Sequence, residues 1–368
     1  MTELAQSAVT VVLFFVVLGV LVLVHELGHF IVARLAGVRV LEFGIGFPPR
    51  AKVLARGGET LYTLNWLPIG GFVKLEGEDG DGADDPRSFT RAPLPVKVLI
   101  LVAGVAMNVL LTIAIFTAVA ALPNRSLGVS IGSVEPGSPA AAAGLASGDT
   151  ILAIDGTRYD QFDGNVLGIA PIDDLRARAG RPVTLTVAHP SGEVSDVQVT
   201  LRPLSDTGPQ RGALGVSKLA LSLRDDSFTR DPVAAGTVGV RRTAAALGLI
   251  LNGLGQLGES IINRPTEAPP ASGPIGIAVQ IGEVFWTGGP LLLLMLAGIL
   301  SANLALVNIL PFPPLDGGRI FVVFLKAIAG TRLSVRVERI TYFVGFVLLF
   351  CFLIWISAFD IVGRGAPR

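Results

Sequence analysis

Residues 8–32 read AVTVVLFFVVLGVLVLVHELGHFIV, an apolar stretch whose only ionisable residues are His25, Glu26 and His29. About 20 mainly apolar residues span the hydrocarbon core of a bilayer, so this stretch predicts a transmembrane helix. A signal peptide fits less well, because no basic residue precedes the apolar run and Arg34 follows it. Ionisable side chains inside a membrane are costly and usually serve a function. The stretch therefore predicts a membrane protein with a functional site in its first span.

The composition agrees with a membrane protein. Apolar residues make up 51% of the 368 residues and charged residues 16%, whereas soluble proteins usually carry about 25% charged residues. The formal net charge is zero, so no basic field favours nucleic acid as a partner. The single cysteine, Cys351, allows neither an internal disulfide nor a thiolate metal site. With three histidines in the chain, a zinc site would need two of them together with carboxylates.

Three further apolar segments, residues 98–122, 291–310 and 340–361, predict spans two to four. Nine lysines and arginines lie between the first two spans and five between the last two. Because cytoplasmic loops carry an excess of basic residues, both loops are predicted to be cytoplasmic. Both termini and the long insert between spans two and three are then predicted to lie outside.

A shorter apolar run, residues 243–257, follows Arg241 and Arg242 and contains Asn252 and Gln256. We predict a surface or interfacial helix here rather than a fifth span. The number of membrane crossings supports this interpretation. A fifth crossing would place the end of the third span on the side of the membrane opposite His25.

The insert at residues 127–203 has the pattern of a small mixed β domain. Strands are predicted at Gly128–Val134 and Thr150–Ile154, a helix at Asp173–Ala179, and a hairpin from Val183–Val187 and Val194–Leu201. The predicted domain order is therefore residues 1–126, a membrane part with two spans; 127–203, the β domain; 204–287, a connecting segment with an amphipathic helix; and 288–368, a membrane part with two spans.

The motif His25-Glu26-Leu27-Gly28-His29 carries the chemistry. On a helix, residues i and i+4 lie on one face, so both imidazoles point the same way. Two neutral imidazoles suit zinc, and Glu26 can accept a proton from a water molecule at the metal. A catalytic zinc needs a third protein ligand. His189 lies in the outside insert, which leaves Asp316 at the end of the third span as the candidate, with a simple Asp-Gly turn as the alternative.

Together these features resemble the site-2 protease family of intramembrane metalloproteases. Its motif N-x-x-P-x-P-x-x-D-G matches Asn308, Pro311, Pro313, Asp316 and Gly317. The resemblance implies that His25, His29 and Asp316 bind zinc and that Glu26 is the general base. It also implies that Asn308, Pro311 and Pro313 help to hold the substrate strand. The chain departs from the family where Val105, rather than proline, follows Ala103-Gly104.

Two more segments are similar to parts of this family. Asn65–Leu75, with Gly70, Gly71 and Phe72, is similar to a cytoplasmic hairpin that pairs with the unwound substrate. The insert resembles a bacterial PDZ domain in Val134-Glu135-Pro136-Gly137-Ser138-Pro139-Ala140 and Ile154-Asp155-Gly156. That resemblance implies binding of a peptide or chain end by strand addition, and a domain that only screens out bulky proteins is the alternative.

The expected fold is thus a polytopic α-helical membrane protein with about four transmembrane helices and an inserted small mixed β, PDZ-like domain. The expected protein is a bacterial zinc metalloprotease that binds one Zn²⁺. It is expected to span the lipid bilayer of the inner membrane, with its active site near the cytoplasmic side. Its expected partners are transmembrane substrate proteins, such as anti-sigma factors or remnant signal peptides. The alternative is a non-enzymatic membrane protein that binds or transports zinc or acts as a PDZ scaffold.

Overall fold

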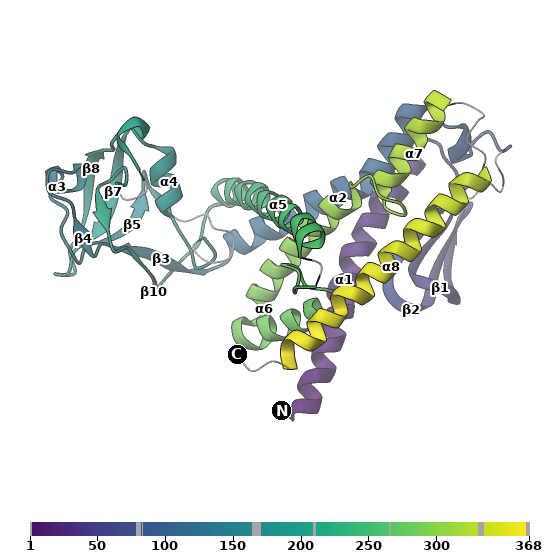
Figure 1. Cartoon of the computed structure of the whole chain (residues 1–368), viewed down its shortest axis with the longest axis horizontal. Helices are drawn as coiled ribbons and strands as arrows, with labels where there is room; N and C mark the ends of the chain where they lie inside the picture. Colours follow the sequence, from purple (N-terminus) through teal and green to yellow (C-terminus); the bar gives the residue numbers. More distant parts are fainter. Residues whose placement is uncertain are drawn as a thin grey trace. The chain divides into compact units, whose positions relative to one another are not determined.

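The computed structural model describes residues 2–78, 82, 84–163, 171–208, 211–264, 266–329 and 335–365. The chain divides into two compact units, one formed by Met1–Val119 with Ala246–Arg368 and the other by Ala120–Ala245. Most of the long helices belong to the first unit, and the second is rich in β-strands (Figure 1). A β-rich unit is therefore inserted between the two halves of a helical unit.

Five helices in the described part of the chain are long and apolar enough to cross a membrane, by length and composition. They are α1 (Glu3–Leu35), α2 (Leu94–Ala121), α5 (Pro232–Asn263), α6 (Pro274–Asn308) and α8 (Val335–Gly365). All but α5 cover most or all of a predicted span, and their most apolar windows have mean hydropathies of 2.2 to 3.0, against 1.3 for α5. α5 includes the predicted interfacial helix and extends beyond it at both ends. Helix lengths therefore admit five spans where the sequence predicted four.

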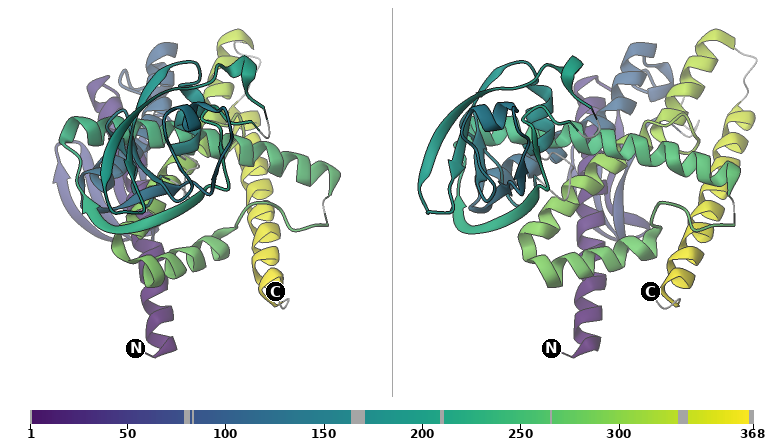
Figure 2. Two further views of the ribbon diagram at one scale, coloured as in Figure 1. Left: turned by 90° about the vertical axis from the view of Figure 1, so that its left-hand side faces the viewer. Right: turned by 60° about the vertical axis from the view of Figure 1, so that its left-hand side comes forward.

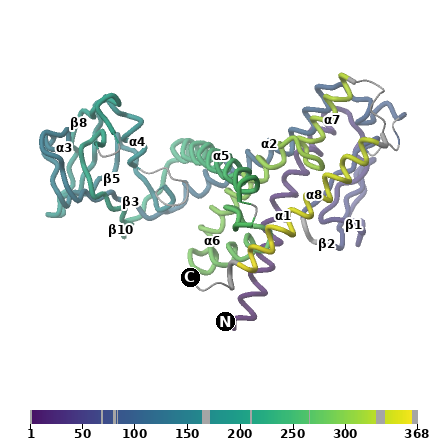
Figure 3. The backbone as a smooth tube through the Cα atoms, viewed as in Figure 1, coloured from purple at the N-terminus to yellow at the C-terminus, as the bar shows by residue number. Residues whose placement is uncertain are grey.

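Helix α6 is interrupted at Gly289, where φ is 70° and ψ is −168°, immediately before Pro290. A left-handed φ suits glycine, and proline supplies no backbone N–H for the helix at the next position. The tube trace in Figure 3 and the turned views in Figure 2 show the two parts of α6 running in different directions. The second part, residues 290–308, ends at Asn308 and covers most of the predicted third span. A short helix, α7 (Asp316–Ala329), follows the proline-rich turn.

The loop between α1 and α2 contains a long antiparallel pair, β1 (Val40–Gly57) and β2 (Thr60–Leu75), followed by the short helix η1 (Phe89–Arg91). Residues 42–45 of β1 pair with residues 61–64 on one side and with residues 71–74 on the other. Residues 71–74 therefore form an edge of this sheet. β2 contacts α1 along the membrane unit (Figure 1), so the predicted segment Asn65–Leu75 lies within the second strand of a longer hairpin.

The second unit is built on a sheet in the order β10-β3-β5-β7-β8, with β6 paired to β5. Its strands are β3 (Asn124–Ser130), β5 (Thr150–Ile154), β6 (Thr157–Arg158), β7 (Pro182–Ala188), β8 (Val194–Thr200) and β10 (Ala220–Phe228). β4 (Ser133–Val134) pairs with β9 (Val216–Ser217), and the helical turns are α3 (Pro139–Ala142), α4 (Pro171–Ala177) and η2 (Leu204–Asp206). The predicted strand Thr150–Ile154 and the predicted hairpin are confirmed.

This unit extends beyond residue 203, where the sequence placed the end of the β domain. β10 pairs with β3, and the first part of α5 is tied to the unit by buried ion pairs. Arg242 is fully buried and donates to Asp160 and Asp163, whose side chains are also fully buried. This cluster could not be predicted from the sequence, because Arg242 lies about 80 residues from both aspartates and meets them only through the tertiary fold.

Candidate metal centre and active site

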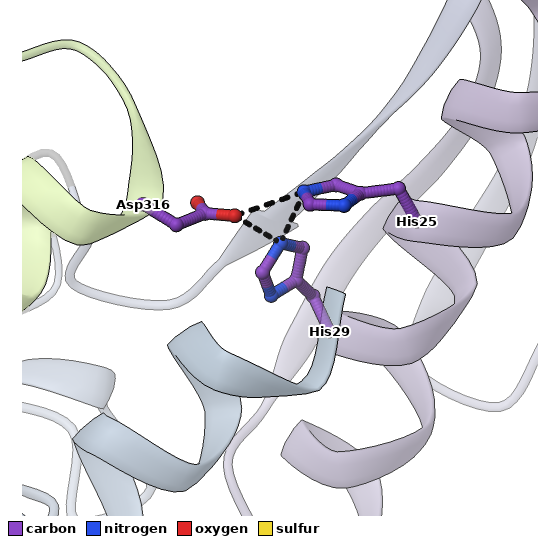
Figure 4. Close-up of side chains that lie close together, drawn as sticks. All are labelled: His25, His29 and Asp316. Carbon is purple, nitrogen blue, oxygen red and sulfur yellow. Dashed lines mark hydrogen bonds and ion pairs between the residues drawn. The ribbon is translucent and has the colours of Figure 1, made fainter. Parts of the chain in front are cut away.

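The two histidines project from successive turns of α1, and Asp316 approaches them from the first turn of α7 (Figure 4). Nε2 of His25 lies 2.9 Å from Oδ2 of Asp316, and Nε2 of His29 lies 3.2 Å from the same oxygen. The two Nε2 atoms are 3.2 Å apart. Residues separated by about 290 positions in the sequence therefore bring three potential ligand atoms to one point. The three residues predicted as metal ligands lie together.

Helix α2 determines how His29 is oriented. Nδ1 of His29 donates to the carbonyl oxygen of Ile100 at 2.7 Å. A proton on Nδ1 leaves Nε2 with a lone pair, which is the form that binds metal. This backbone hydrogen bond therefore directs the coordinating nitrogen of His29 toward Asp316.

Asn108 plays the corresponding part for His25. Its side-chain amide is fully buried and lies 3.3 Å from Nδ1 of His25. Oδ1 of Asn108 has no hydrogen-bond partner among the described residues. Exchanging the amide oxygen and nitrogen by a half-turn places Oδ1 opposite Nδ1, where it accepts the Nδ1 proton. His25 then also presents an unprotonated Nε2.

These residues fit a zinc ion. With Nδ1 protonated in both imidazoles, the Nε2 lone pairs of His25 and His29 converge on Oδ2 of Asp316, 2.9 and 3.2 Å away. One cation can bridge three electron-pair donors that lie this close together. Two imidazoles and one carboxylate form a donor set of catalytic zinc sites.

Close packing between α1 and α2 depends on two glycines. A Cβ at Gly28 would lie 2.4 Å from the carbonyl oxygen of Ala103, and a Cβ at Gly104 would lie 2.5 Å from Nε2 of His29. Ile100, Gly104 and Asn108 recur every four residues and so share the face of α2 that meets the histidines. Ser301 of α6 donates to the carbonyl oxygen of Asn108 at 2.9 Å and so ties α6 to the same stretch of α2.

Glu26 and Asn308 line a cavity of about 360 Å³ beside the three ligand residues. Among the described residues, none forms a hydrogen bond or ion pair with Glu26. Its carboxylate is therefore free to take part in proton transfer. Nδ2 of Asn308 lies 3.4 Å from Nε2 of His25, so this predicted substrate-binding residue does reach the site.

The sheet edge forms another wall of the same cavity. Gly71 and Phe72, at the edge formed by residues 71–74, line the cavity, and Gly71 packs close to Glu26. Gly70, by contrast, packs against Val22, so it shapes the strand without lining the cavity.

The proline-rich turn contributes differently from the sequence prediction. Pro314 and Leu315 line the cavity, and Pro311 and Pro313 do not. Pro313 lies against Gly345 of α8 instead, so its contact helps to place the turn that carries Asp316.

Sequence reasoning missed the role of Asn108 and the position of Arg319. Asn108 was visible as the lone amide of an uncharged span, and its spacing of four from Gly104 was the available signal. Arg319 lies one turn after Asp316 on α7 and lines the same cavity. Basic residues are common in loops, so the sequence did not distinguish it from its neighbours.

Two imidazoles, one carboxylate and an adjacent glutamate inside an apolar helical unit define a membrane metalloprotease. The model of Peptidase family M50 matches residues 13–352, and the chain belongs to this family. The resemblance to site-2 proteases is thereby confirmed, and the protein is a multi-pass membrane zinc metalloprotease.

Relatives agree with this assignment over nearly their whole length. The chain is 32% identical over 344 residues to "Putative zinc metalloprotease CPE1693" of Clostridium perfringens, covering 93% of this chain and 95% of that protein. It is 30% identical over 363 residues to "Putative zinc metalloprotease BR1156/BS1330_I1152" of Brucella suis, covering 94% and 93%. It is 27% identical over 437 residues to "Zinc metalloprotease RasP" of Geobacillus kaustophilus, covering 97% and 99%.

Proposed function

We propose that this zinc metalloprotease hydrolyses a peptide bond within the transmembrane segments of substrate proteins, as in regulated intramembrane proteolysis. The main observation in support is that His25, His29 and Asp316 lie together beside Glu26, in a cavity of an apolar helical unit. Anti-sigma factors and remnant signal peptides are the substrate classes we propose. The family assignment favours this enzyme over a zinc-binding scaffold or transporter.

The proposed chemistry assigns one task to each group. His25, His29 and Asp316 would hold the zinc ion, which would supply a Lewis acid for the water molecule and the scissile carbonyl group. Glu26 takes a proton from the attacking water and returns it to the leaving amine. Asn108 and the carbonyl of Ile100 hold the two imidazoles in the required tautomer.

A substrate helix must be opened before cleavage, because its amides are hydrogen-bonded and shielded. We propose that the opened strand pairs with the sheet edge at residues 71–74, which lies beside Glu26. Asn308 then binds a polar backbone group of that strand. Pro311 and Pro313 act through the position of the turn rather than by touching the substrate.

We place the protein in the bacterial inner membrane with the β-rich unit outside and the metal site near the cytoplasmic side. The distribution of lysine and arginine supports this orientation. The contact of 2.9 Å between His25 and Asp316 supports four spans with α5 at the interface. If α5 crossed the bilayer fully, α6 would end on the side opposite the histidines. For the β-rich unit we propose that it binds a peptide or chain end, with steric screening as the alternative.

The test is cleavage of a tagged single-span substrate in proteoliposomes, with bound zinc measured in each sample. Parent protein should cleave, and Glu26→Gln should keep zinc while losing about 100-fold or more of the activity, the scale of general-base catalysis. A Glu3→Gln variant, changed at the exposed start of α1, should behave like the parent. If both the parent and Glu26→Gln hold zinc and none of several membrane substrates is cleaved, the proposal is wrong.

A further inference from the structure

A second cavity, of about 590 Å³, lies beside the catalytic one. Glu78, Leu101 and Arg319 line both cavities. Glu78 follows the end of β2, and Arg319 lies on α7 one turn after Asp316. Their side chains form an ion pair, so a single charged contact lies where the two cavities adjoin.

Charge distinguishes the two cavities. Arg319 is the sole arginine or lysine among the described residues that line the catalytic cavity, where the carboxylates of Glu26, Asp316 and Glu78 are found. Four basic residues and two acidic residues line the second cavity. They are Lys97, Arg319, Lys326 and Arg339, and Glu78 and Glu338. Among described residues Lys97 contacts no carboxylate, and its ammonium group donates to the carbonyl oxygen of Thr90 at 2.7 Å.

Peptide hydrolysis creates a product with a new charged C-terminus, and this product must leave the active site. Breaking the amide C–N bond with water gives an amine and a C-terminal carboxylic acid, which is ionised near neutral pH. This new carboxylate forms close to Glu26, whose negative charge repels it. An arginine fork is the side chain best matched to a carboxylate, and charge-assisted pairs of this kind are strong.

We propose that Arg319 binds the newly formed C-terminal carboxylate of the cleaved chain and that the second cavity is its exit. In the resting protein, the Glu78 carboxylate forms an ion pair with the Arg319 guanidinium. The product carboxylate then replaces Glu78, and the surplus of basic side chains draws the product away from the metal. This inference rests on the proposed function, because it takes the product of intramembrane cleavage as its ligand.

Direct binding of labelled peptides tests the inference without relying on activity. The full-length zinc-loaded protein in detergent is titrated with a peptide matching the N-terminal fragment of a model substrate. One version of the peptide ends in a free carboxylate and the other in an amide, and fluorescence anisotropy gives the two Kd values. Their ratio measures recognition of the carboxylate, and zinc content is checked in every variant.

Opposite shifts are expected from the two members of the ion pair. Arg319→Gln should reduce the preference for the acid by about 10-fold or more, the size of a charged hydrogen bond. Glu78→Gln removes the competing carboxylate and should raise that preference. Lys52→Gln, an exposed change in the same sheet outside both cavities and away from the edge at residues 71–74, should leave the ratio unchanged and so controls for loss of one positive charge.

A ratio that is the same in Arg319→Gln and in the parent would overturn the inference, as would shifts of equal sign in Arg319→Gln and Glu78→Gln. Such a result leaves cleavage by the parent protein intact. Failure of the proposed function has a different signature, since the parent would then cleave no membrane substrate whatever the peptide ratios.

Discussion

At the residue scale, the metal site depends on a buried amide that is not itself a ligand. Asn108 contacts His25 from α2 and is fully buried. Asn108→Leu should weaken zinc binding by about 10- to 100-fold, the usual effect of removing a partner that orients a metal-binding histidine. Competition with a zinc-sensitive dye measures the affinity. Asn303→Leu is the matched control, because this amide lies in α6 of the same membrane unit and, among the described residues, forms no hydrogen bond with His25, His29 or Asp316. An equal loss in both variants would contradict the role of Asn108.

A second residue-scale prediction concerns space rather than hydrogen bonding. A Cβ at Gly104 would lie 2.5 Å from Nε2 of His29, so Gly104→Ala must push α2 and the imidazole apart. We expect at least a 100-fold loss of zinc affinity with the helices still formed, as seen by circular dichroism. Gly19→Ala adds the same methyl group to α1 where nothing lies within 4 Å. Normal zinc affinity in Gly104→Ala would show that the close approach is unimportant.

The candidate ligands His25 and His29 were predictable from sequence because ionisable side chains are costly in an apolar span, and their spacing on a helix places them on one face. Asp316 lies beyond the predicted third span and was predicted from its position near the end of that span and from the family motif. Asn108 could not be assigned in the same way, since its role depends on which face of α2 meets α1. That packing is a tertiary property and is decided by small residues such as Gly28 and Gly104.

At the element scale, the β1–β2 hairpin was likewise predictable from sequence only in part. The family resemblance predicted a cytoplasmic hairpin containing Gly71 and Phe72, but not that residues 42–45 would pair on both sides. This double pairing is what leaves residues 71–74 as an edge beside the cavity. Strand register arises from contacts between distant residues, so local pattern could not give it.

If the sheet edge at residues 71–74 pairs with substrate, binding should depend on the backbone N–H groups of the substrate strand. Peptide inhibitors spanning a cleavage site can be N-methylated at one position at a time, which removes a single N–H donor. If the peptide adds a strand, weaker inhibition should appear at every second position, because alternate N–H groups of a strand face its partner. Each sensitive position should cost about 5-fold, the value of one hydrogen bond near 1 kcal/mol. Uniform sensitivity, or none, would argue against pairing at residues 71–74.

At the scale of the whole molecule, the two units have separate cores, and buried charges anchor the first part of α5 to the β-rich unit. Arg242→Met leaves Asp160 and Asp163 short of a buried partner, so it should destabilise this unit by about 3–5 kcal/mol. Arg241→Met, at a partly exposed neighbour, should cost about 1 kcal/mol or less. Hydrogen exchange of residues 150–163 with denaturant reports the difference, and similar costs for both variants would contradict the anchoring role.

Removing the metal should affect the helical unit alone. Without zinc, the site lacks the cation that would link His25 and His29 of α1 to Asp316 of α7, so the contact between these helices should loosen. Chelation should therefore raise hydrogen exchange in residues 22–32 and 308–320, abolish cleavage, and leave exchange in the sheet of the β-rich unit unchanged. Added zinc should restore the parent protein, because bound ligand stabilises the folded site by mass action. His25→Ala should show the loosened pattern with or without zinc. Equal loosening of the β-rich sheet on chelation would mean that the two units share one cooperative structure, against the separation of their cores.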